Sequence, residues 1–337
     1  MRAGSGIGVS LGRRLAGCAA ATAVVLTGGP TAFASAPTPD GPPSLRDFQQ
    51  RTGEFLALQD ARSGSAAVGS GGGIGVDPVE PPADAPLLGD GVAVALYGAP
   101  QLTATAIGKR SPAGAARKLR RQARAYERVT GRPVALSLNL IGVVATASAG
   151  SDRRYRARQD PNVIRTYLKA ARSVGARLTL DIQPGRAPVI QELRALREWI
   201  ALPDVDVGID PEWNVGRKGV PGRDEGSITY RKLNRASRWL ERLVEREGVP
   251  AKALIVHQFR AGSISGRRRV KQRQGASVLL NFDGIGSRRA KKTGYKGLAT
   301  NPDLFDGFSL FYDRDVSLMK PRSVLRLRPE VDYAMYQ

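Results

Sequence analysis

The chain has 337 residues, 42% of them hydrophobic, so it is long enough to bury one large core or two smaller ones. Its 52 Lys and Arg against 30 Asp and Glu give a formal net charge of +22, which favours anionic partners, although a solvated basic surface accounts for the same charge. One Cys and one His, Cys18 and His257, exclude a disulfide framework, a His-rich zinc site and a His–Cys dyad, so any catalysis must rest mainly on carboxylates.

Residues 1–34 have the features of an export signal. Arg2, Arg13 and Arg14 precede or flank an apolar run that is too short to span a bilayer as a mature helix, and "AFA" (32–34) fits a small-x-small cleavage site. Cys18 in "LAGC" resembles a lipidation site, but the apolar run follows it instead of preceding it. We therefore expect a secreted or cell-wall-associated protein with no transmembrane segment in the mature chain, and favour free secretion over a lipid anchor.

Residues 35–89 are rich in Gly, Ser and Pro and indicate an arm and linker. From residue 90 to 337, apolar runs alternate with amphipathic stretches. The helical stretches include residues 112–131, 161–175 and 229–248. The predicted strands cover residues 92–98, 133–140, 177–183, 205–213, 253–259, 277–284, 308–313 and 331–337.

This alternation predicts an α/β fold with a parallel sheet. Eight strands within residues 90–337 match a (β/α)8 TIM-type barrel, which typically has about 250 residues, with the eighth strand at the chain end. A doubly wound sheet is the competing architecture. No GxGxxG motif follows the first predicted strand, so nucleotide binding gains no support.

Acidic residues alternate with apolar ones in "DVGIDPEW" (206–213). A strand places alternate side chains on opposite faces, so Asp206, Asp210 and Glu212 share the face that would line a barrel. Asp206 lies near the start of the strand, where we expect a structural role. Other predicted strands also carry polar residues toward their C-terminal ends, where barrel active sites lie.

Clustered carboxylates at that end indicate glycoside hydrolysis, which needs one acid and one nucleophile or base. We assign Glu212 as the general acid, Asp210 as a positioning or polarising group, and Asp181 or Asp283 as the second catalytic carboxylate. His257 is expected to be a hydrogen-bonded strand residue instead of a base, and Trp213 either stacks on a sugar or packs internally. The predicted substrate-binding residues are Tyr97, Asn139, Gln183, Trp213, Gln258, Asn281, Tyr312 and Asp313.

The strand around Asp210 resembles the D-G-x-D-x-D-x-E strand of chitinase-like and endo-N-acetylglucosaminidase-like hydrolases, and the D-x-E of secreted lysozyme-like barrels is equally near. With Gly208 and Asp210 aligned, Glu212 takes the position of the family's second Asp and Asn214 that of its final Glu. As a whole, the chain resembles secreted actinobacterial (β/α)8-barrel proteins. The resemblance implies a glycoside-hydrolase-like protein.

Three functions follow as expectations. The first is a secreted glycoside hydrolase that acts on an extracellular or cell-wall polysaccharide and needs no cofactor or metal. The second is a non-catalytic barrel whose basic runs at 266–275 and 287–292 bind anionic cell-wall polymer. The third, ranked lower, uses Asp181, Asp210, Glu212 and Asp283 as ligands of a hard cation. No nucleic-acid partner is expected, because aromatic residues make up only 6% of the chain and no recognition motif accompanies the charge.

Overall fold

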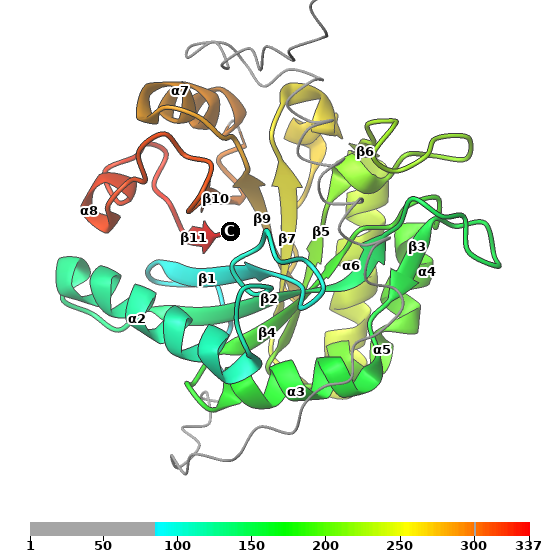
Figure 1. Cartoon of the computed structure of the whole chain (residues 1–337), viewed down its shortest axis with the longest axis horizontal. Coiled ribbons are helices and arrows are strands. Elements are labelled where there is room, and N and C mark those ends of the chain that lie inside the picture. Colours follow the sequence, from blue (N-terminus) through cyan, green and yellow to red (C-terminus); the bar gives the residue numbers. More distant parts are fainter. Residues whose placement is uncertain (1–84, 300) are drawn as a thin grey trace, which may run out of the picture. The chain divides into compact units, whose positions relative to one another are not determined.

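A computed structural model describes residues 85–299 and 301–337 of the chain. The predicted export signal, Cys18 and most of the predicted arm lie outside the described residues. Within them, eight parallel strands close into a barrel (Figure 1). In barrel order these strands are β1 (Ala93–Gly98), β2 (Ala135–Ala145), β4 (Arg177–Ile182), β5 (Val205–Ile209), β7 (Lys252–Gln258), β9 (Ala276–Phe282), β10 (Phe305–Leu310) and β11 (Tyr333–Tyr336).

The barrel closes because β11 pairs with both β10 and β1, and Ala93 lies opposite Tyr333 in the β1–β11 ladder. β1 in turn pairs with β2 from Ala93 to Gly98. The predicted (β/α)8 architecture, with its eighth strand at the end of the sequence, is therefore confirmed. The doubly wound alternative is wrong, because such a sheet would leave two open edges.

Helices surround the barrel (Figure 1). Two of the predicted helices are capped at both ends. Ser111 and Thr229 cap their N-termini with a side-chain oxygen, and Gly131 and Gly248 end them in the left-handed conformation. The predicted helix over 161–175 ends slightly earlier, at Arg172. The helices are α2 (Pro112–Thr130), α3 (Pro161–Arg172), α4 (Val189–Ala195), α5 (Arg197–Ile200), α6 (Tyr230–Glu247), α7 (Arg288–Leu298) and α8 (Pro321–Val324).

Two apolar layers hold the fold together, as the strand period of two requires. One parity of strand residues, such as Leu138 and Val207, packs against the helices. The other parity, including Ala95 and Ile255, fills the interior of the barrel. Leu87 and Leu88, which precede β1, are buried in this interior cluster as well.

Several elements differ from the sequence-based expectation. The strand predicted over 205–213 ends at Ile209 and a 3-10 turn follows at Pro211–Trp213, because Pro211 lacks the N–H that a strand ladder requires. The basic run 287–292 forms the start of α7 instead of a loop, with Ser287 as its N-cap. Short elements that the pattern did not indicate are β3 (Arg156–Arg158), β6 (Ile228–Thr229), β8 (Ile264–Ser265) and the 3-10 turns Ala261–Ser263 and Arg267–Arg269.

None of the helices in the described part of the chain combines the length and apolarity needed to cross a membrane.

Candidate functional site

A cluster of polar side chains lies inside the barrel at the C-terminal ends of β4, β5, β7 and β9. Its centre is His257 near the end of β7, one residue before the strand stops. Carboxylates reach this histidine from three neighbouring strands. They belong to Asp181 on β4, Asp210 just after β5 and Asp283 just after β9. The four side chains are nearly fully buried.

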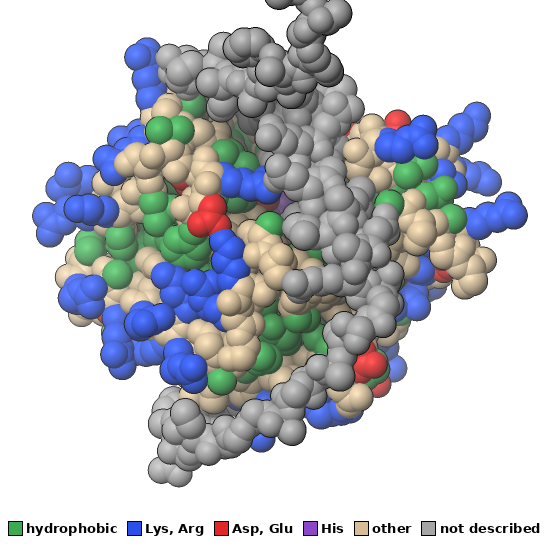
Figure 2. Space-filling model, viewed as in Figure 1, with side chains coloured by type: hydrophobic (Ala, Val, Ile, Leu, Met, Phe, Trp, Pro, Cys, Tyr) green, Lys and Arg blue, Asp and Glu red, His purple; other side chains and the backbone are tan. Residues whose placement is uncertain are grey.

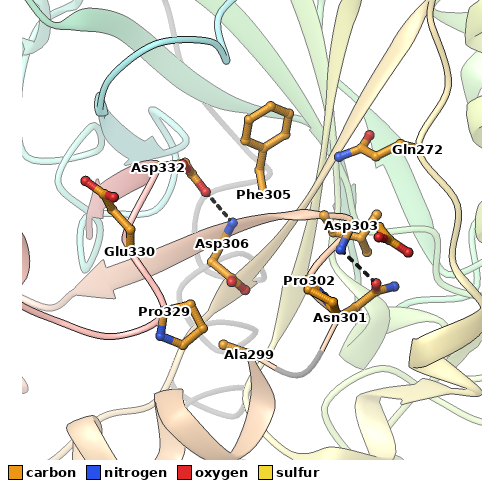
Figure 3. Close-up of a pocket in the computed structure, with 11 residues that line it drawn as sticks. Gln272, Ala299, Asn301, Pro302, Asp303, Phe305, Asp306, Pro329, Glu330 and Asp332 are labelled. Atoms are coloured by element: carbon orange, nitrogen blue, oxygen red, sulfur yellow. Dashed lines mark hydrogen bonds between the residues drawn. The ribbon is translucent and has the colours of Figure 1, made fainter.

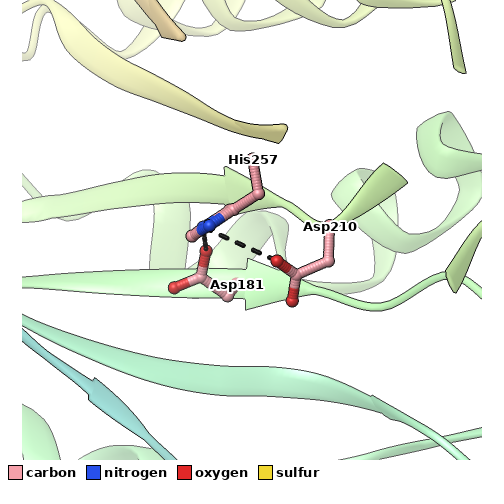
Figure 4. A group of neighbouring side chains, drawn as sticks. All are labelled: Asp181, Asp210 and His257. Atoms are coloured by element: carbon pink, nitrogen blue, oxygen red, sulfur yellow. Dashed lines mark hydrogen bonds and ion pairs between the residues drawn. The ribbon is translucent and has the colours of Figure 1, made fainter. Parts of the chain in front are cut away.

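Both ring nitrogens of His257 contact carboxylates, and Figure 4 shows the side of the ring that faces Asp181 and Asp210. Nδ1 lies 2.6 Å from Asp283 Oδ2, and Nε2 lies 3.0 Å from Asp181 Oδ1. Asp210 Oδ1 is farther from Nε2, at 3.6 Å. A histidine whose two nitrogens both face carboxylates is best satisfied as the imidazolium, which donates from both.

The pKa values agree with a charged His257. Burial lowers the pKa of His257, but the charges of Asp210 and Asp283 more than offset this and hold it well above its usual range. Burial raises the pKa of Asp210 well above its usual range, a rise that His257 opposes and Glu212 strengthens. Burial also raises the pKa of Asp181, and the hydrogen bond with His257 opposes that rise. The cluster therefore holds an imidazolium beside carboxyl groups that take up protons easily.

Gly208 creates the space that Asp181 occupies. Gly208 lies opposite Asp181 in the β4–β5 ladder, on the interior-facing side of β5. A Cβ atom at this position would overlap the Asp181 carboxylate. On the other side, Asn139 Nδ2 donates to Asp181 Oδ2 over 3.1 Å. Asp181 is thus fixed by three neighbouring strands and lies deepest in the cluster.

Asp283 is the most extensively hydrogen-bonded carboxylate of the cluster. Its Oδ1 accepts a hydrogen bond of 2.6 Å from Asn281 Nδ2 and one from the Ser309 hydroxyl. Gln337 Nε2 approaches the same oxygen at 3.5 Å and donates to Ser309 Oγ over 3.3 Å. These contacts hold the Asp283 side chain in one orientation.

Asp210 is bound from the first strand of the barrel. Tyr97 donates its hydroxyl to Asp210 Oδ2 over 2.8 Å, and Gln183 Nε2 lies 3.4 Å from that hydroxyl. Gln183 Oε1 accepts a 3.0 Å hydrogen bond from the backbone N–H of Ala145. Tyr97, Asn139, Gln183 and Asn281 are buried, and each donates a hydrogen bond to a carboxylate of the cluster or to the Tyr97 hydroxyl. Their role in substrate binding stays a prediction.

Glu212 lies in the 3-10 turn that follows β5 and is buried like the rest of the group, with 6% of the residue exposed against 3% for Asp283 and 1% for Asp210. One oxygen each of Asp210, Glu212 and Asp283 lie within 4.8 Å of one another. Glu212 thus lies beside two other carboxyl groups, just beyond the end of β5.

Two sets of side chains have the spacing of metal ligands. One is the oxygen trio of Asp210, Glu212 and Asp283, which suits a hard cation. The other combines Asp181, Asp210 and His257. The second set is a poor ligand set as it stands, because a protonated imidazole has no lone pair to offer a metal.

Four residues predicted to bind substrate lie away from the cluster. Gln258 has the opposite strand parity from His257, and its Oε1 accepts a hydrogen bond of 3.3 Å from Arg267. Tyr312 stacks on Tyr336 and donates to Gln122 of α2 over 3.1 Å. Asp313 lies on the surface and pairs with Lys109, while Trp213 is buried in a small apolar cluster with Ala145.

Sequence reasoning missed the central position of His257. The parity of β7 carried the signal, because His257 shares a face with Ala253 and Ile255, which point into the barrel. Register adds to it, since Ile209 pairs with Val256 and the next residues are Asp210 and His257. Ser309 and Gln337 were likewise not predicted as site residues.

Asp206 lies at the opposite end of β5 and has a different environment. Its carboxylate forms two hydrogen bonds with the Arg177 guanidinium, of 2.6 and 3.0 Å, and accepts a third of 2.8 Å from the Ala253 N–H. Arg177 also donates to the carbonyl of Ala85 over 3.1 Å. These contacts agree with the structural role expected for Asp206.

The fold and the cluster together define a closed (β/α)8-barrel protein with a buried carboxylate–imidazolium network at the C-terminal end of its strands. No protein-family model matches the chain, and no curated protein matches it. The functional argument therefore rests on the site itself.

Proposed function

We propose that the protein is a glycoside hydrolase that acts on an extracellular or cell-wall polysaccharide. The observation that carries this proposal is the meeting of Asp210, Glu212 and Asp283, whose oxygens lie within 4.8 Å at the barrel end where active sites form. Most glycoside hydrolases use two carboxyl groups that flank the glycosidic bond, at separations that range from about 5 to 9.5 Å. The fold by itself says nothing about this activity.

The geometry favours Asp283 over Asp181 as the second catalytic carboxylate. Asp283 belongs to the oxygen trio that contains Glu212, whereas Asp181 meets only Asp210 and His257 at that spacing. In the proposed mechanism, Asp283 attacks the anomeric carbon while Glu212 protonates the leaving oxygen as the glycosidic bond breaks. Ionised Glu212 then takes a proton from a water molecule, which displaces Asp283 from the sugar. The short spacing is nearer to the roughly 5–5.5 Å of retaining enzymes than to the 6.5–9.5 Å of inverting ones, so we propose retention of configuration.

The remaining residues of the network are assigned positioning roles. His257 balances the negative charge of Asp283 and Asp181, and Asp181 holds the second ring nitrogen. Asp210, one of whose oxygens lies within 4.8 Å of an oxygen of Glu212, is assigned the role of positioning and polarising that acid. Tyr97 fixes the orientation of Asp210 through its 2.8 Å hydrogen bond.

The test measures reducing ends released from purified cell-wall polysaccharide and from soluble β-linked glycans. We expect Glu212→Gln to lower the rate by at least about a hundredfold, the order of a general-acid contribution. Glu198→Gln, on the exposed face of α5, should keep the wild-type rate and serves as the matched control. A wild-type protein inactive on every glycan, or a fully active Glu212→Gln variant, rejects the proposal. Loss of activity in chelator with recovery in Mg²⁺ or Ca²⁺ would assign the oxygen trio to a metal instead.

A second candidate function is non-catalytic binding of an anionic wall polymer, and one surface feature favours it. Lys292 and Lys296 of α7, together with Arg326 and Arg328 just after α8, line a hollow of about 320 Å³. Within residues 85–299 and 301–337, none of the four forms an ion pair with an acid. Such a hollow suits phosphate or carboxylate groups of a polymer.

Figure 2 shows Lys and Arg side chains spread around the periphery of the visible face. The experiment must therefore distinguish binding at this hollow from a general attraction of the polymer to the basic surface. We expect replacement of the four cations by Gln to weaken binding to polyphosphate several-fold, with a smaller salt dependence. The matched control replaces Arg117, Arg121, Arg124 and Arg128, which form an exposed stripe on α2. Equal losses in the two variants reject the hollow as the binding site.

A further inference from the structure

A cavity of about 570 Å³ lies at the opposite end of the barrel from the cluster. Figure 3 shows the residues that line it. Its walls come from the segments that lead into β9, β10 and β11, that is, from the N-terminal ends of three adjacent strands. Four acids line it, and they are Asp303, Asp306, Glu330 and Asp332. No Lys or Arg is among the described residues that line this cavity, in a chain whose net charge is +22.

Asp306 is the residue that points to a ligand. Its side chain lines the cavity, and the residue is only 8% exposed. In the described part of the chain, no side chain or backbone group donates a hydrogen bond to its carboxylate or pairs with it. The backbone N–H of Asp306 is satisfied separately, by a 2.8 Å hydrogen bond to Asp332 Oδ2. The Asp306 carboxylate therefore faces the cavity, partly withdrawn from water and without a donor among the described residues, and a cation or a proton that joins it there lowers the cost of its burial.

The negative charge around Asp306 is concentrated. Burial and then the charge of Asp332 raise the pKa of Asp306 to about 7, and burial raises the pKa of Asp332 as well. Near neutral pH, Asp306 is therefore close to half-ionised. A positively charged ligand would displace its proton and supply the missing partner.

The lining also has an apolar part. Leu304, Phe305, Pro302 and Pro329 contribute hydrocarbon surface beside the acids (Figure 3). The volume lies in the range of small-molecule sites, about 300–1,000 Å³. Among the described residues, acids spaced closely enough for a metal ion occur only in the cluster at the other end of the barrel. The ligand should therefore carry separated positive charges on an aliphatic chain.

We propose that this cavity binds a small aliphatic polyamine, with one ammonium group at Asp306 and a second toward Glu330 or Asp303. The methylene chain would lie against Phe305 and the two prolines. The strong positive charge of the chain as a whole repels such a ligand, so attraction must come from the cavity itself. This site is independent of the proposed hydrolase activity, because it lies at the other end of the strands.

Isothermal titration calorimetry with spermidine tests the proposal on the full chain. We expect saturable binding at pH 8 and roughly tenfold weaker binding at pH 6, where most Asp306 carries a proton. Asp306→Asn should weaken binding at pH 8 about tenfold or more and remove the pH dependence. Glu245→Gln, on the exposed face of α6, should bind like the wild type.

A second variant tests the cavity at an independent position. Glu330 is exposed at the rim of the cavity, so Glu330→Gln should fold normally and weaken spermidine binding several-fold. Absence of binding at pH 8, unchanged affinity in both cavity variants, or tighter binding of Mg²⁺ than of spermidine would each overturn the assignment.

Discussion

The Nδ1 atom of His257 lies 2.6 Å from Oδ2 of Asp283, and this contact ties the end of β7 to the end of β9. The other ring nitrogen, 3.0 Å from Asp181, extends the link to β4. One imidazolium thus joins residues of three barrel strands within a buried site. Its removal should affect both the stability of the barrel and the orientation of the carboxylates.

His257→Gln should lower the free energy of unfolding by about 3–5 kcal/mol, because it leaves buried carboxylates without their cation. The pKa of His257 is raised in the folded state, so its contribution is complete below the unfolded value near 6.5 and is lost as pH rises through the folded pKa. Urea denaturation of both proteins across the pH range checks this. A stability difference that stays constant from pH 6 to pH 10 contradicts a charged His257.

Gly208→Ala should disturb the cluster without replacing any of its functional groups. The added methyl group would overlap the Asp181 carboxylate, so we expect a loss of about 1–3 kcal/mol in unfolding free energy and a fall in kcat. Gly297→Ala is the control, since a Cβ atom there meets nothing within 4 Å and Gly297 lies within α7. If the two variants have the same unfolding free energy and the same kcat, the position of the Asp181 carboxylate does not depend on the missing side chain of Gly208.

Asp206→Asn should lower the stability of the protein without lowering its catalytic rate, as expected for an acid with a structural role. Arg177 would lose its buried partner, which costs about 3–5 kcal/mol of unfolding free energy. The kcat of the folded variant should stay within about twofold of wild type, because Asp206 lies at the far end of β5 from Glu212. Glu247→Gln, which breaks the exposed pair with Arg197, should leave the unfolding midpoint unchanged. A large loss of kcat in folded Asp206→Asn places this residue in the catalytic network instead.

Asp306→Asn should stabilise the protein at pH 8 but not at pH 4. The pKa of Asp306 is about 7 in the folded state against about 3.8 in an unfolded chain, so stability falls as pH rises between these values and levels off above them. The full effect is up to about 4 kcal/mol. Thermal unfolding of both proteins at the two pH values provides the measurement. A variant that is less stable at pH 8 shows that ionised Asp306 has a partner in the fold.

The architecture could be predicted because the apolar strands alternate regularly with capped helices, and because Tyr333–Tyr336 is apolar enough to be the eighth strand. Strand parity also predicted that Asp181, Asp210, Asn281 and Tyr97 face the interior, since these residues lie on or next to hydrogen-bonded ladders. Beyond the ends of the ladders, strand parity no longer predicts the direction of a side chain. Tyr312 and Asp313 follow β10, and their directions are set by contacts with Gln122 and Lys109, far away in the sequence.

The strands that complete the barrel also limit how it can assemble. Ala93 of β1 finds its ladder partner in Tyr333, so nearly the whole barrel sequence separates the two sides of this seam. Bringing two such distant segments together has a large entropic cost. We therefore expect this pairing to form late in folding. Until Tyr333–Tyr336 inserts, β1 and β10 each present an unsatisfied row of backbone donors and acceptors to other chains. The last few residues of the barrel therefore decide between a closed barrel and a sheet with two unpaired edges that can bind other strands.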